Sequence, residues 1–389
     1  MAQRLLVRGG VAVVRGELAK LDIMIAGAQI AAIGAALDPG GAIVLDASGL
    51  TVGPGFIDVH VHGGGDVSFF SKDPGSVDAY ARWAPRNGVT GFLVSTVGRD
   101  AGDTSALLGA LARAMRPAEG AEPLGFHLEG PFLNPERKGA FPRSYLRPPS
   151  VAEFEAFQQA ARGHIRQVTV APELEGALDL IRAVADSGSV PAIGHTDATY
   201  AEANAGFAAG ARHVTHLFNA MRPLHQRDGG PIAAALLQAG TCELICDGAH
   251  VAPETLRLAY SLLGPARTVI VTDNLEMAGA SGHDGQFGGE RLSIKGNAAV
   301  RADGTIAGSV ATMDQHVRNA VRFLGIPVQD VFQLCSANPA VVAGASARKG
   351  RIEPGFDADV VLLNEALEVV ATVCRGEIAF LREPGRLRR

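Results

Sequence analysis

Eight apolar runs rich in β-branched residues recur through the middle of the chain. In order they occupy residues 55–63, 89–96, 124–130, 167–173, 191–196, 213–218, 242–248 and 268–274. Patterns typical of amphipathic helices separate most of them, as at residues 76–88, 174–188, 199–210 and 253–264. Hydrophobic strands that alternate with such helices are what a buried parallel sheet requires. Eight units over roughly 290 residues predict a closed (β/α)₈ barrel, the TIM-type α/β fold, whose usual size is about 250 residues plus insertions.

An open, doubly wound parallel sheet is the rival architecture. It would normally show a glycine-rich phosphate turn, GxGxxG, after its first strand, and that pattern is missing here. The closed barrel is therefore the preferred interpretation.

The two ends of the chain share a different pattern of short β segments broken by glycine turns. Three such segments open the chain, at residues 4–14, 21–34 and 42–52, and two close it, at 351–364 and 368–381. Chain ends often lie close together, so we expect one small β-sandwich built from both termini. The predicted domains are a discontinuous sandwich (residues 1–53 and 346–389) and a barrel (residues 54–345).

Composition narrows the class of protein. Of 389 residues, 47% are hydrophobic and 19% charged, which supplies a large core and argues against disorder. The formal charge of −5 and the lack of basic clusters argue against nucleic acid as a partner. No apolar run approaches the roughly 20 residues that cross a bilayer, and no signal-peptide pattern opens the chain. We expect a soluble cytoplasmic protein whose four cysteines are buried free thiols.

Histidines and acids stand at or beside the carboxyl ends of five of the eight predicted strands. They are His60, His62, Glu129, His195, His216 and Asp273. In a closed barrel these ends converge on one mouth, where active sites are built. Imidazole and carboxylate ligands suit zinc, iron or manganese, so the sequence predicts a metal site there.

Strand parity refines these assignments. His60 and His62 are two apart and point to the same face, so both can reach one ion. His127 shares a face with Glu129 and is expected to support the site from behind.

The remaining histidines receive ordinary roles. His213 is three residues from His216 and cannot also point inward from a regular strand, so we expect it to be structural. The others are expected to be surface or loop residues: His164, His225, His283 and His316.

Several motifs resemble a known family. PGFIDVHVHG resembles the first-strand signature of the amidohydrolase superfamily. HLEGPFLNPERKGA, GHTDATY, THLFNAM, CDGAHV and VTDN together resemble the N-acetylglucosamine-6-phosphate deacetylase family. The resemblance extends from Pro54 to the closing GFDADVVLL and implies the same barrel with a small β-sandwich.

The resemblance also implies a metal-dependent reaction. It implies that Glu129, His195 and His216 hold the principal ion, and that His60 and His62 match a second position, with Glu129 bridging and Asp273 nearby. One or two divalent ions per subunit are expected, zinc foremost, with iron or manganese as alternatives. The reaction implied is hydrolysis of the acetamide of N-acetyl-D-glucosamine 6-phosphate, with Asp273 as the acid and base.

Substrate contacts are implied in the same way. They fall on Ala140, Asn219, Ala220, Arg227, His250, Ile306, Ala307 and Gly308. Arg227 matches the arginine that binds the phosphate, and residues 306–308 resemble a loop that closes against the sugar. The resemblance further implies a homodimer, with phosphate contacts that cross between subunits as one option.

Three positions depart from the family pattern. Phe141 stands where a histidine commonly donates to the acetamide oxygen, and a phenyl ring cannot donate. Our hypothesis is that the second metal takes over this polarising role. Asn274 and Asp197 replace a usual alanine and a common asparagine, which leaves room for an altered substrate preference.

Other functions remain open at this point. The nearest are a deacetylase of a related N-acyl amino sugar or N-acyl-D-amino acid, and a cyclic-amide hydrolase such as a dihydroorotase or hydantoinase. Cyclic-amide hydrolases commonly use a modified lysine at the end of the fourth strand, and QVTVAPE has none. A non-catalytic barrel scaffold would usually have lost metal ligands. A nucleotide-dependent transferase lacks its phosphate-binding glycine loop.

Overall fold

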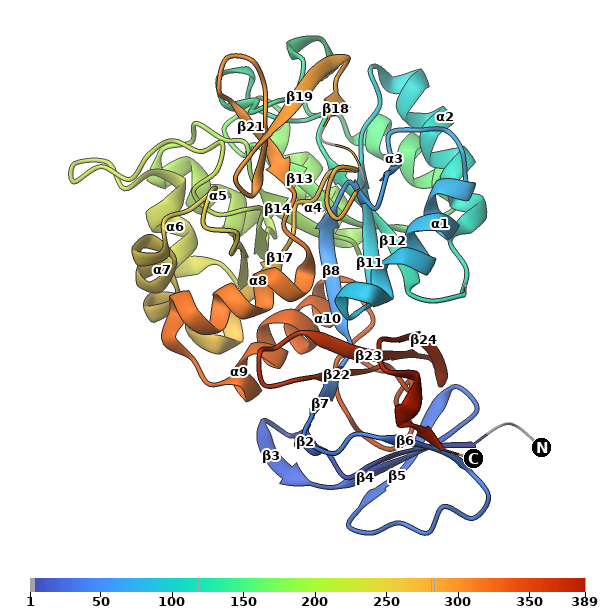
Figure 1. Cartoon of the computed structure of the whole chain (residues 1–389). Helices are drawn as coiled ribbons and strands as arrows, with labels where there is room; N and C mark the ends of the chain where they lie inside the picture. The colour runs from blue at the N-terminus through green and yellow to red at the C-terminus, as the bar shows by residue number, and fades with distance from the viewer. Residues whose placement is uncertain (1–3, 118, 281, 283, 389) are drawn as a thin grey trace.

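The computed structural model describes residues 4–117, 119–280, 282 and 284–388. Its central sheet has eight parallel strands hydrogen-bonded in chain order (Figure 1). They are β8 (Phe56–Val61), β11 (Val89–Thr96), β12 (Glu122–Glu129), β13 (Ile165–Val170), β14 (Val190–Ile193), β15 (His213–Val214), β16 (Thr241–Ile245) and β17 (Thr268–Val271). Each falls within or overlaps one of the eight apolar runs, so the predicted α/β barrel is confirmed.

The sheet closes just beyond the last residue of β17. The backbone N–H of Asp273 donates to the carbonyl of His60 at 2.9 Å, and that of His62 donates to the carbonyl of Asn274 at 2.8 Å. Closure therefore brings the end of the eighth run directly beside the histidines of the first.

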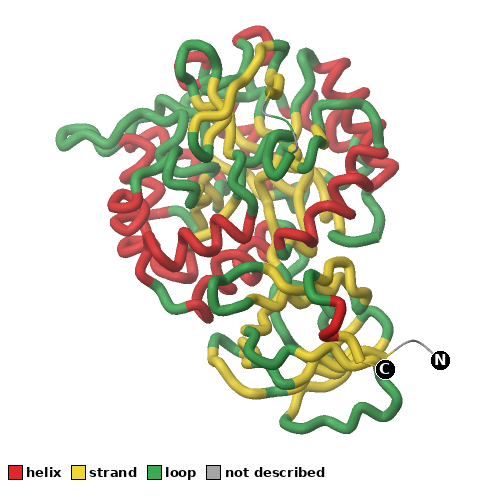
Figure 2. Tube along the Cα trace, viewed as in Figure 1, coloured by secondary structure: helices red, strands yellow, loops and turns green. Residues whose placement is uncertain are grey.

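Helices form an outer ring around the barrel (Figure 2). They are α1 (Gly75–Trp83), α2 (Ala101–Leu111), α3 (Val151–Ala160), α4 (Ala177–Asp186), α5 (Tyr200–Ala209), α6 (Gly230–Gln238), α7 (Pro253–Arg267) and α8 (Met313–Ala320). Helix α4 shows the pattern that predicted them, because Leu180, Ile181 and Val184 are buried on one face. Thr199 begins α5 with a capping box to Glu202, which satisfies amides at the helix start.

The two ends of the chain build two further sheets at the base of the barrel (Figure 1). One has the order β25-β6-β1-β4-β5, with β1 (Arg4–Arg8), β4 (Asp22–Ala26), β5 (Gln29–Gly34), β6 (Ile43–Asp46) and β25 (Leu387–Arg388). The other has the order β24-β23-β22-β7-β2-β3, with β2 (Val11–Val14), β3 (Glu17–Lys20), β7 (Thr51–Pro54), β22 (Val360–Leu363), β23 (Val369–Cys374) and β24 (Glu377–Leu381).

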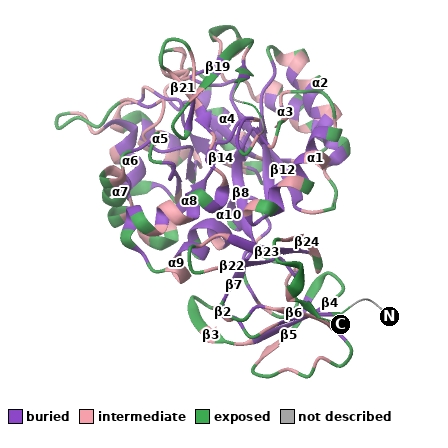
Figure 3. Ribbon diagram, in the orientation of Figure 1, coloured by how far each residue is buried: buried purple, intermediate pink, exposed green. Residues whose placement is uncertain are grey.

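One hydrophobic core joins these end segments. Leu5, Val7 and Ile23 from the amino end pack in the same cluster as Val360 and Leu362 from the carboxyl end. The expected β-sandwich from both termini is therefore present, whereas the exact boundaries at residues 53/54 and 345/346 stay a prediction. Figure 3 shows the buried residues concentrated in the barrel wall and between these sheets.

A buried ion cluster joins the barrel to the sandwich. The ammonium of Lys349, whose side chain is fully buried, lies 2.9 Å from Glu122, 3.0 Å from Asp357 and 2.5 Å from Asp359. Glu122 is the first residue of β12, so this contact lies at the amino end of the barrel strands. The opposite, carboxyl end is left open for a site.

A small antiparallel sheet follows β17 and lies over that open end (Figure 1). Its strands are β18 (Asp284–Phe287), β19 (Glu290–Lys295), β20 (Ala298–Val300) and β21 (Ile306–Ser309). The segment 306–308, expected as a loop, is thus part of a strand. The N–H of Ser309 donates to the carbonyl of Asp273 at 2.8 Å, which ties this sheet to the end of the eighth barrel strand.

Two expectations from composition can be compared with the structure. All four cysteines are buried and free, as predicted. Within the described residues, no helix combines the length and apolar character needed to cross a membrane.

Candidate active site

The six histidines and acids singled out from the sequence lie together at the carboxyl end of the barrel. They form two groups, His60–His62–Asp273 and Glu129–His195–His216, and the ligand atoms within each group lie within 4.8 Å of one another. All six residues are buried.

Glu129 connects the two groups. Its Oε1 lies 3.1 Å from His195 Nε2 and 2.9 Å from His216 Nε2, whereas its Oε2 lies 3.0 Å from His62 Nε2. One carboxylate therefore presents an oxygen to each side of the centre.

Local backbone conformation aims these side chains inward. His60 lies on β8, and His62 directly follows Val61, the last residue of that strand, so the two histidines face the barrel interior. His195, His216 and Asp273 follow their strands with positive φ of 48°, 28° and 52°. Such left-handed backbone is costly away from glycine and is found where the surrounding fold enforces it, often at functional sites.

Hydrogen bonds on the outer nitrogens set the tautomers of three histidines. The Nδ1–H of His62 donates to the carbonyl of Ser95 at 3.0 Å, and that of His195 donates to the carbonyl of Arg137 at 2.8 Å. His60 Nδ1 donates to Glu243 at 2.9 Å. Each Nε2 then faces the centre, where it can bind a metal ion or, when protonated, donate to Glu129 or Asp273.

The Nε2 atoms lie close to one another, which indicates whether the site suits a cation. His60 Nε2 and His62 Nε2 are 3.3 Å apart, and His195 Nε2 and His216 Nε2 are 3.0 Å apart. Two ring nitrogens at such distances repel each other unless a proton or a metal ion lies between them. Nitrogen and carboxylate donors in this number fit a divalent transition metal such as zinc, iron or manganese.

The charges in the centre agree with this fit. Burial raises the pKa of Glu129, but the charge of His60 and hydrogen bonds from His195 and His216 outweigh it and hold the pKa well below its usual range. Burial also opposes a charge on His60, yet Glu129, Glu243 and Asp273 raise the pKa of that imidazole well above its ordinary value. The carboxylates are ionised and draw positive charge to the centre.

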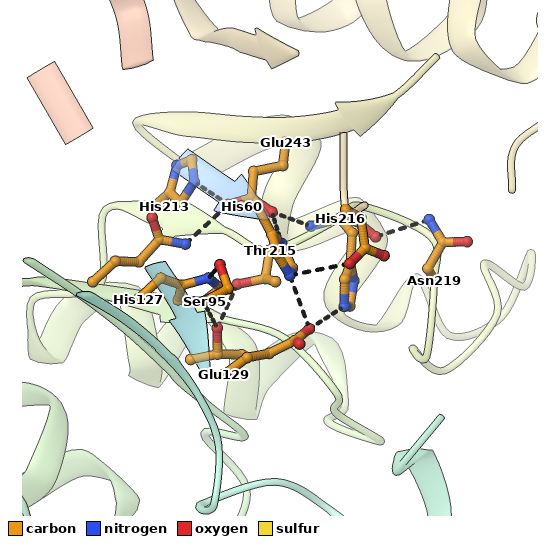
Figure 4. A network of polar contacts seen from close by, with 12 residues as sticks. His60, Ser95, His127, Glu129, His213, Thr215, His216, Asn219 and Glu243 are labelled. Atoms are coloured by element: carbon orange, nitrogen blue, oxygen red, sulfur yellow. Dashed lines mark hydrogen bonds and ion pairs between the residues drawn. The ribbon is translucent and has the colours of Figure 1, made fainter. Parts of the chain in front are cut away.

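Two further histidines, His127 and His213, belong to the polar network around the centre (Figure 4). His127 bonds to Ser95 Oγ at 2.9 Å and packs its ring edge-on against His60, at 4.5 Å between centroids. His213 bonds to Glu243 at 3.0 Å. His213 points inward together with His216 because β15 ends at Val214, so His216 is no longer on a regular strand.

Glu243 is a residue of the centre that sequence reasoning missed. It lies in the middle of β16 with no exposed surface and contacts His60, His213, Gln167 and the backbone of His216. The available signal was an acid inside the otherwise apolar strand TCELIC, since an unpaired charge is rarely buried.

The prediction for His316 was wrong. His316 is completely buried on α8, where its Nδ1 accepts the N–H of Cys246 at 3.1 Å. His316 is a polar residue on the buried face of an amphipathic helix. The sequence pattern marks such a face by its apolar residues, so it does not reveal that a histidine lies among them. His164 is half-buried and His225 exposed, whereas His283 lies outside the described residues.

A cavity of about 280 Å³ opens beside the histidine–carboxylate centre. Six of the eight expected substrate contacts line it, namely Ala140, Asn219, Ala220, His250, Ile306 and Ala307. His250 is held by Asp247, whose Oδ2 lies 2.6 Å from its Nδ1, and its Nε2 lies 3.9 Å from Asp273 Oδ2.

The other two expected contacts lie outside the lining described for this cavity. Gly308 lies against the backbone of Asp273, where a Cβ would come within 2.8 Å of the carbonyl of Asp273. Arg227 is exposed on the segment before α6, which extends away from the barrel at the left of Figure 1.

An aromatic wall faces the centre. The Phe141 ring lies 5.6 Å from the His195 ring and 5.1 Å from Phe287, which sequence reasoning did not single out. Both phenyl rings line the cavity. Residue 141 thus lies beside the histidine–carboxylate centre, as the family pattern implied, but offers no donor.

The other two departures lie in the framework. Asp197 pairs with Arg137 at 2.7 Å and Arg222 at 3.1 Å, and the carbonyl of Asn274 takes part in barrel closure.

A closed barrel with histidines and carboxylates gathered at its carboxyl end is the arrangement typical of metal-dependent hydrolases. The chain belongs to the amidohydrolase family, whose model matches residues 51–379.

Individual relatives indicate a more specific class of hydrolase. The chain is 39% identical to the N-acetylglucosamine-6-phosphate deacetylase of Bacillus subtilis, over 84% of each chain. It is 34% identical to the N-acetylgalactosamine-6-phosphate deacetylase of Escherichia coli O157:H7, over 89% of this chain and 92% of that one. A variant of the Mycobacterium smegmatis deacetylase, solved with N-acetyl-D-glucosamine 6-phosphate, superposes with a TM-score of 0.90 at 34% identity, over 97% and 99% of the two chains.

Proposed function

We propose that this hydrolase cleaves the acetamide of N-acetyl-D-glucosamine 6-phosphate, giving D-glucosamine 6-phosphate and acetate in amino-sugar catabolism or recycling. One observation carries the proposal: the six-residue centre borders a cavity lined by Asn219, Ala220 and His250, which match substrate contacts of the deacetylase family. The names of the relatives support the same substrate class.

We propose that Glu129, His195 and His216 hold the principal ion and that His60, His62 and Asp273 hold a second, with Glu129 between them. Zinc is the first candidate, with iron or manganese as alternatives. When bound, a divalent ion polarises the amide carbonyl and lowers the pKa of water to about 7.

Asp273 is the proposed acid and base. Burial raises the pKa of its carboxyl, but the charge of His60 and the hydrogen bond from His62 lower it below the ordinary value, so the group begins ionised. It borders the cavity and can take a proton from the attacking water and pass it to the departing sugar nitrogen. Such transfers are worth about 10²–10⁴-fold in rate.

The phosphate needs a cation, and we propose that Arg227 supplies it across a homodimer. Arg227 is exposed on a segment that extends from the barrel, and Leu224 on the same segment is 54% exposed. Leu237 on α6 and Leu258 on α7 are also exposed, which gives this side of the molecule apolar surface for a second copy. A guanidinium can bind phosphate bidentately. We propose that the dimer acts in the cytoplasm.

The test is acetate release by the purified chain loaded in turn with zinc, manganese or iron. We expect the highest kcat/KM for N-acetyl-D-glucosamine 6-phosphate and much lower values for the unphosphorylated sugar and for N-acetyl-D-amino acids. N-acetyl-D-galactosamine 6-phosphate must be included, because one relative carries that name. A preference for the galactosamine epimer or the amino acids would overturn the substrate, and no turnover with any metal would overturn the function.

A further inference from the structure

The carboxylate of Glu243 is wholly buried and accepts four hydrogen bonds (Figure 4). Its Oε1 accepts from His213 Nε2 at 3.0 Å and from the amide of Gln167 at 2.9 Å. Its Oε2 accepts from His60 Nδ1 at 2.9 Å and from the backbone N–H of His216 at 2.8 Å. Four acceptor sites are all that an ionised carboxylate has, so this group is saturated.

Saturation fixes the orientation of His60. Because both oxygens of Glu243 serve only as acceptors, His60 must carry a proton on Nδ1, and its Nε2 faces the centre. That Nε2 lies 3.4 Å from Glu129 Oε1 and 3.3 Å from Asp273 Oδ1. A neutral amide at position 243 would point an NH₂ group at two of the four donors.

His60 differs from the other histidines of the centre in that its Nδ1 donates to a carboxylate. The Nδ1 atoms of His62 and His195 donate to backbone carbonyls, and the buried Nδ1 of His216 has no partner within the described part of the chain. A charged acceptor raises the basicity of an imidazole ligand more than a carbonyl does, and such partners typically change metal affinity 10–100-fold. Because Glu243 bonds to the ring of His60, we expect this change in metal affinity at the His60–His62–Asp273 group.

We propose that Glu243 is a positioning residue that makes the His60–His62–Asp273 group a true ion site, so that each chain holds two divalent ions. The inference deepens the proposed function and rests on it, since the ions are those assigned there. Glu243 does not reach the cavity and acts through His60.

The test compares Glu243→Gln with Gln167→Met, which removes one donor to Glu243 and leaves His60 and its hydrogen bond in place. Zinc is titrated into the metal-free form of the full-length protein against a chromophoric chelator, and metal per chain is measured by mass spectrometry. The wild type and Gln167→Met should bind two ions per chain. Glu243→Gln should bind the first with unchanged affinity and the second 10–100-fold more weakly.

Circular dichroism and thermal unfolding establish that each variant is folded. If Glu243→Gln does not fold, Glu243→Asp takes its place, because it keeps the charge but shortens the reach to His60, and only the second ion should bind more weakly. A folded variant at position 243 with wild-type affinity for both ions overturns the proposal, as does a wild type that saturates at one ion.

Metal binding and turnover separate the two proposals. A wild type that binds two ions but releases no acetate refutes the proposed function and leaves the role of Glu243 intact. A wild type that releases acetate with a single ion refutes the role of Glu243 and leaves the function intact.

Discussion

Phe141 offers a quantitative test of how the amide carbonyl is activated. We predict that Phe141→His alone changes kcat/KM less than 10-fold, whereas the same change partly rescues a His60→Ala, His62→Ala double variant. The reasoning is that a donor at position 141 and the second metal group serve the same oxygen. The donor at position 141 and the second metal group are then partly redundant, so that adding the donor matters most when the metal group is lost.

The structure sets the size of the effect. The loop that carries Phe141 is fixed, because the carbonyl of Arg137 accepts from His195 Nδ1 at 2.8 Å and that of Ala140 accepts from Arg301 at 3.2 Å. A histidine placed 5.6 Å from the ring of His195 is therefore held in position with little freedom to lose. One such donor is worth about 10²–10³-fold in rate, or about 2.7–4 kcal/mol. We expect the double variant to lose at least about 10³-fold and the donor to restore roughly 10-fold or more of it.

The assay is a double-mutant cycle in kcat/KM for acetate release, with position 141 on one axis and the His60/His62 pair on the other. Circular dichroism is the control, because removing His60 leaves the buried Glu243 with three donors instead of four. A coupling energy near zero, meaning that Phe141→His has the same effect in both backgrounds, would refute the reasoning. A double variant with a near-normal rate would refute it as well.

Four further outcomes are expected. Asp273→Asn should lower kcat by about 10²–10⁴-fold while a substrate analogue still binds in calorimetry, and near-normal turnover would contradict its role. Arg227→Ala should raise KM for the phosphosugar and leave the unphosphorylated sugar unaffected; equal effects on both would exclude a phosphate contact. Lys349→Met should lower the free energy of unfolding by about 3–5 kcal/mol, because Asp359 is left buried with its charge unpaired. With an unfolding entropy of about 2.1 cal/mol/K per residue, that is a fall in Tm of about 4–6 °C. Burial raises the pKa of Glu122, but Arg348 and Lys349 lower it from 4.5 to about 2. The ionised Glu122 therefore stabilises the folded protein by about 3 kcal/mol above pH 5, and this stabilisation is lost as the pH falls towards 2. Glu122→Gln should flatten that part of the acid-unfolding curve.

The periodic parts of the molecule could be predicted from the sequence. Apolar runs of strand length show which segments form the barrel, and polar residues at their carboxyl ends show where a site lies, because barrel closure brings all these ends together. The same logic located His60 and Glu129 without any structure, since strand parity fixes the face of each side chain.

Contacts between distant segments could not be predicted in this way. Glu243 was missed because its four partners come from distant segments of the chain, namely β8, β13, β15 and the residues just after β15, and no local sequence pattern predicts these contacts. The sheet β18–β21 was missed because its strands are short and partly exposed, so none of them forms an apolar run like those of the barrel strands. His213 was misjudged in direction because the backbone leaves the strand at Val214, which parity cannot anticipate.

The pairing of β7 with β22 has a consequence for how the polypeptide matures. Residues 51–54 lie directly before the first barrel strand, yet their antiparallel neighbour is residues 360–363, near the far end of the chain. During synthesis, residues 51–54 cannot pair with residues 360–363 until almost the whole chain has left the ribosome, and the apolar residues of the amino-terminal strands stay exposed until then. Pairings over such sequence separations are slow to form and leave strand edges open to wrong partners. Shortening the carboxyl end by a few dozen residues should therefore harm the beginning of the protein as much as its end.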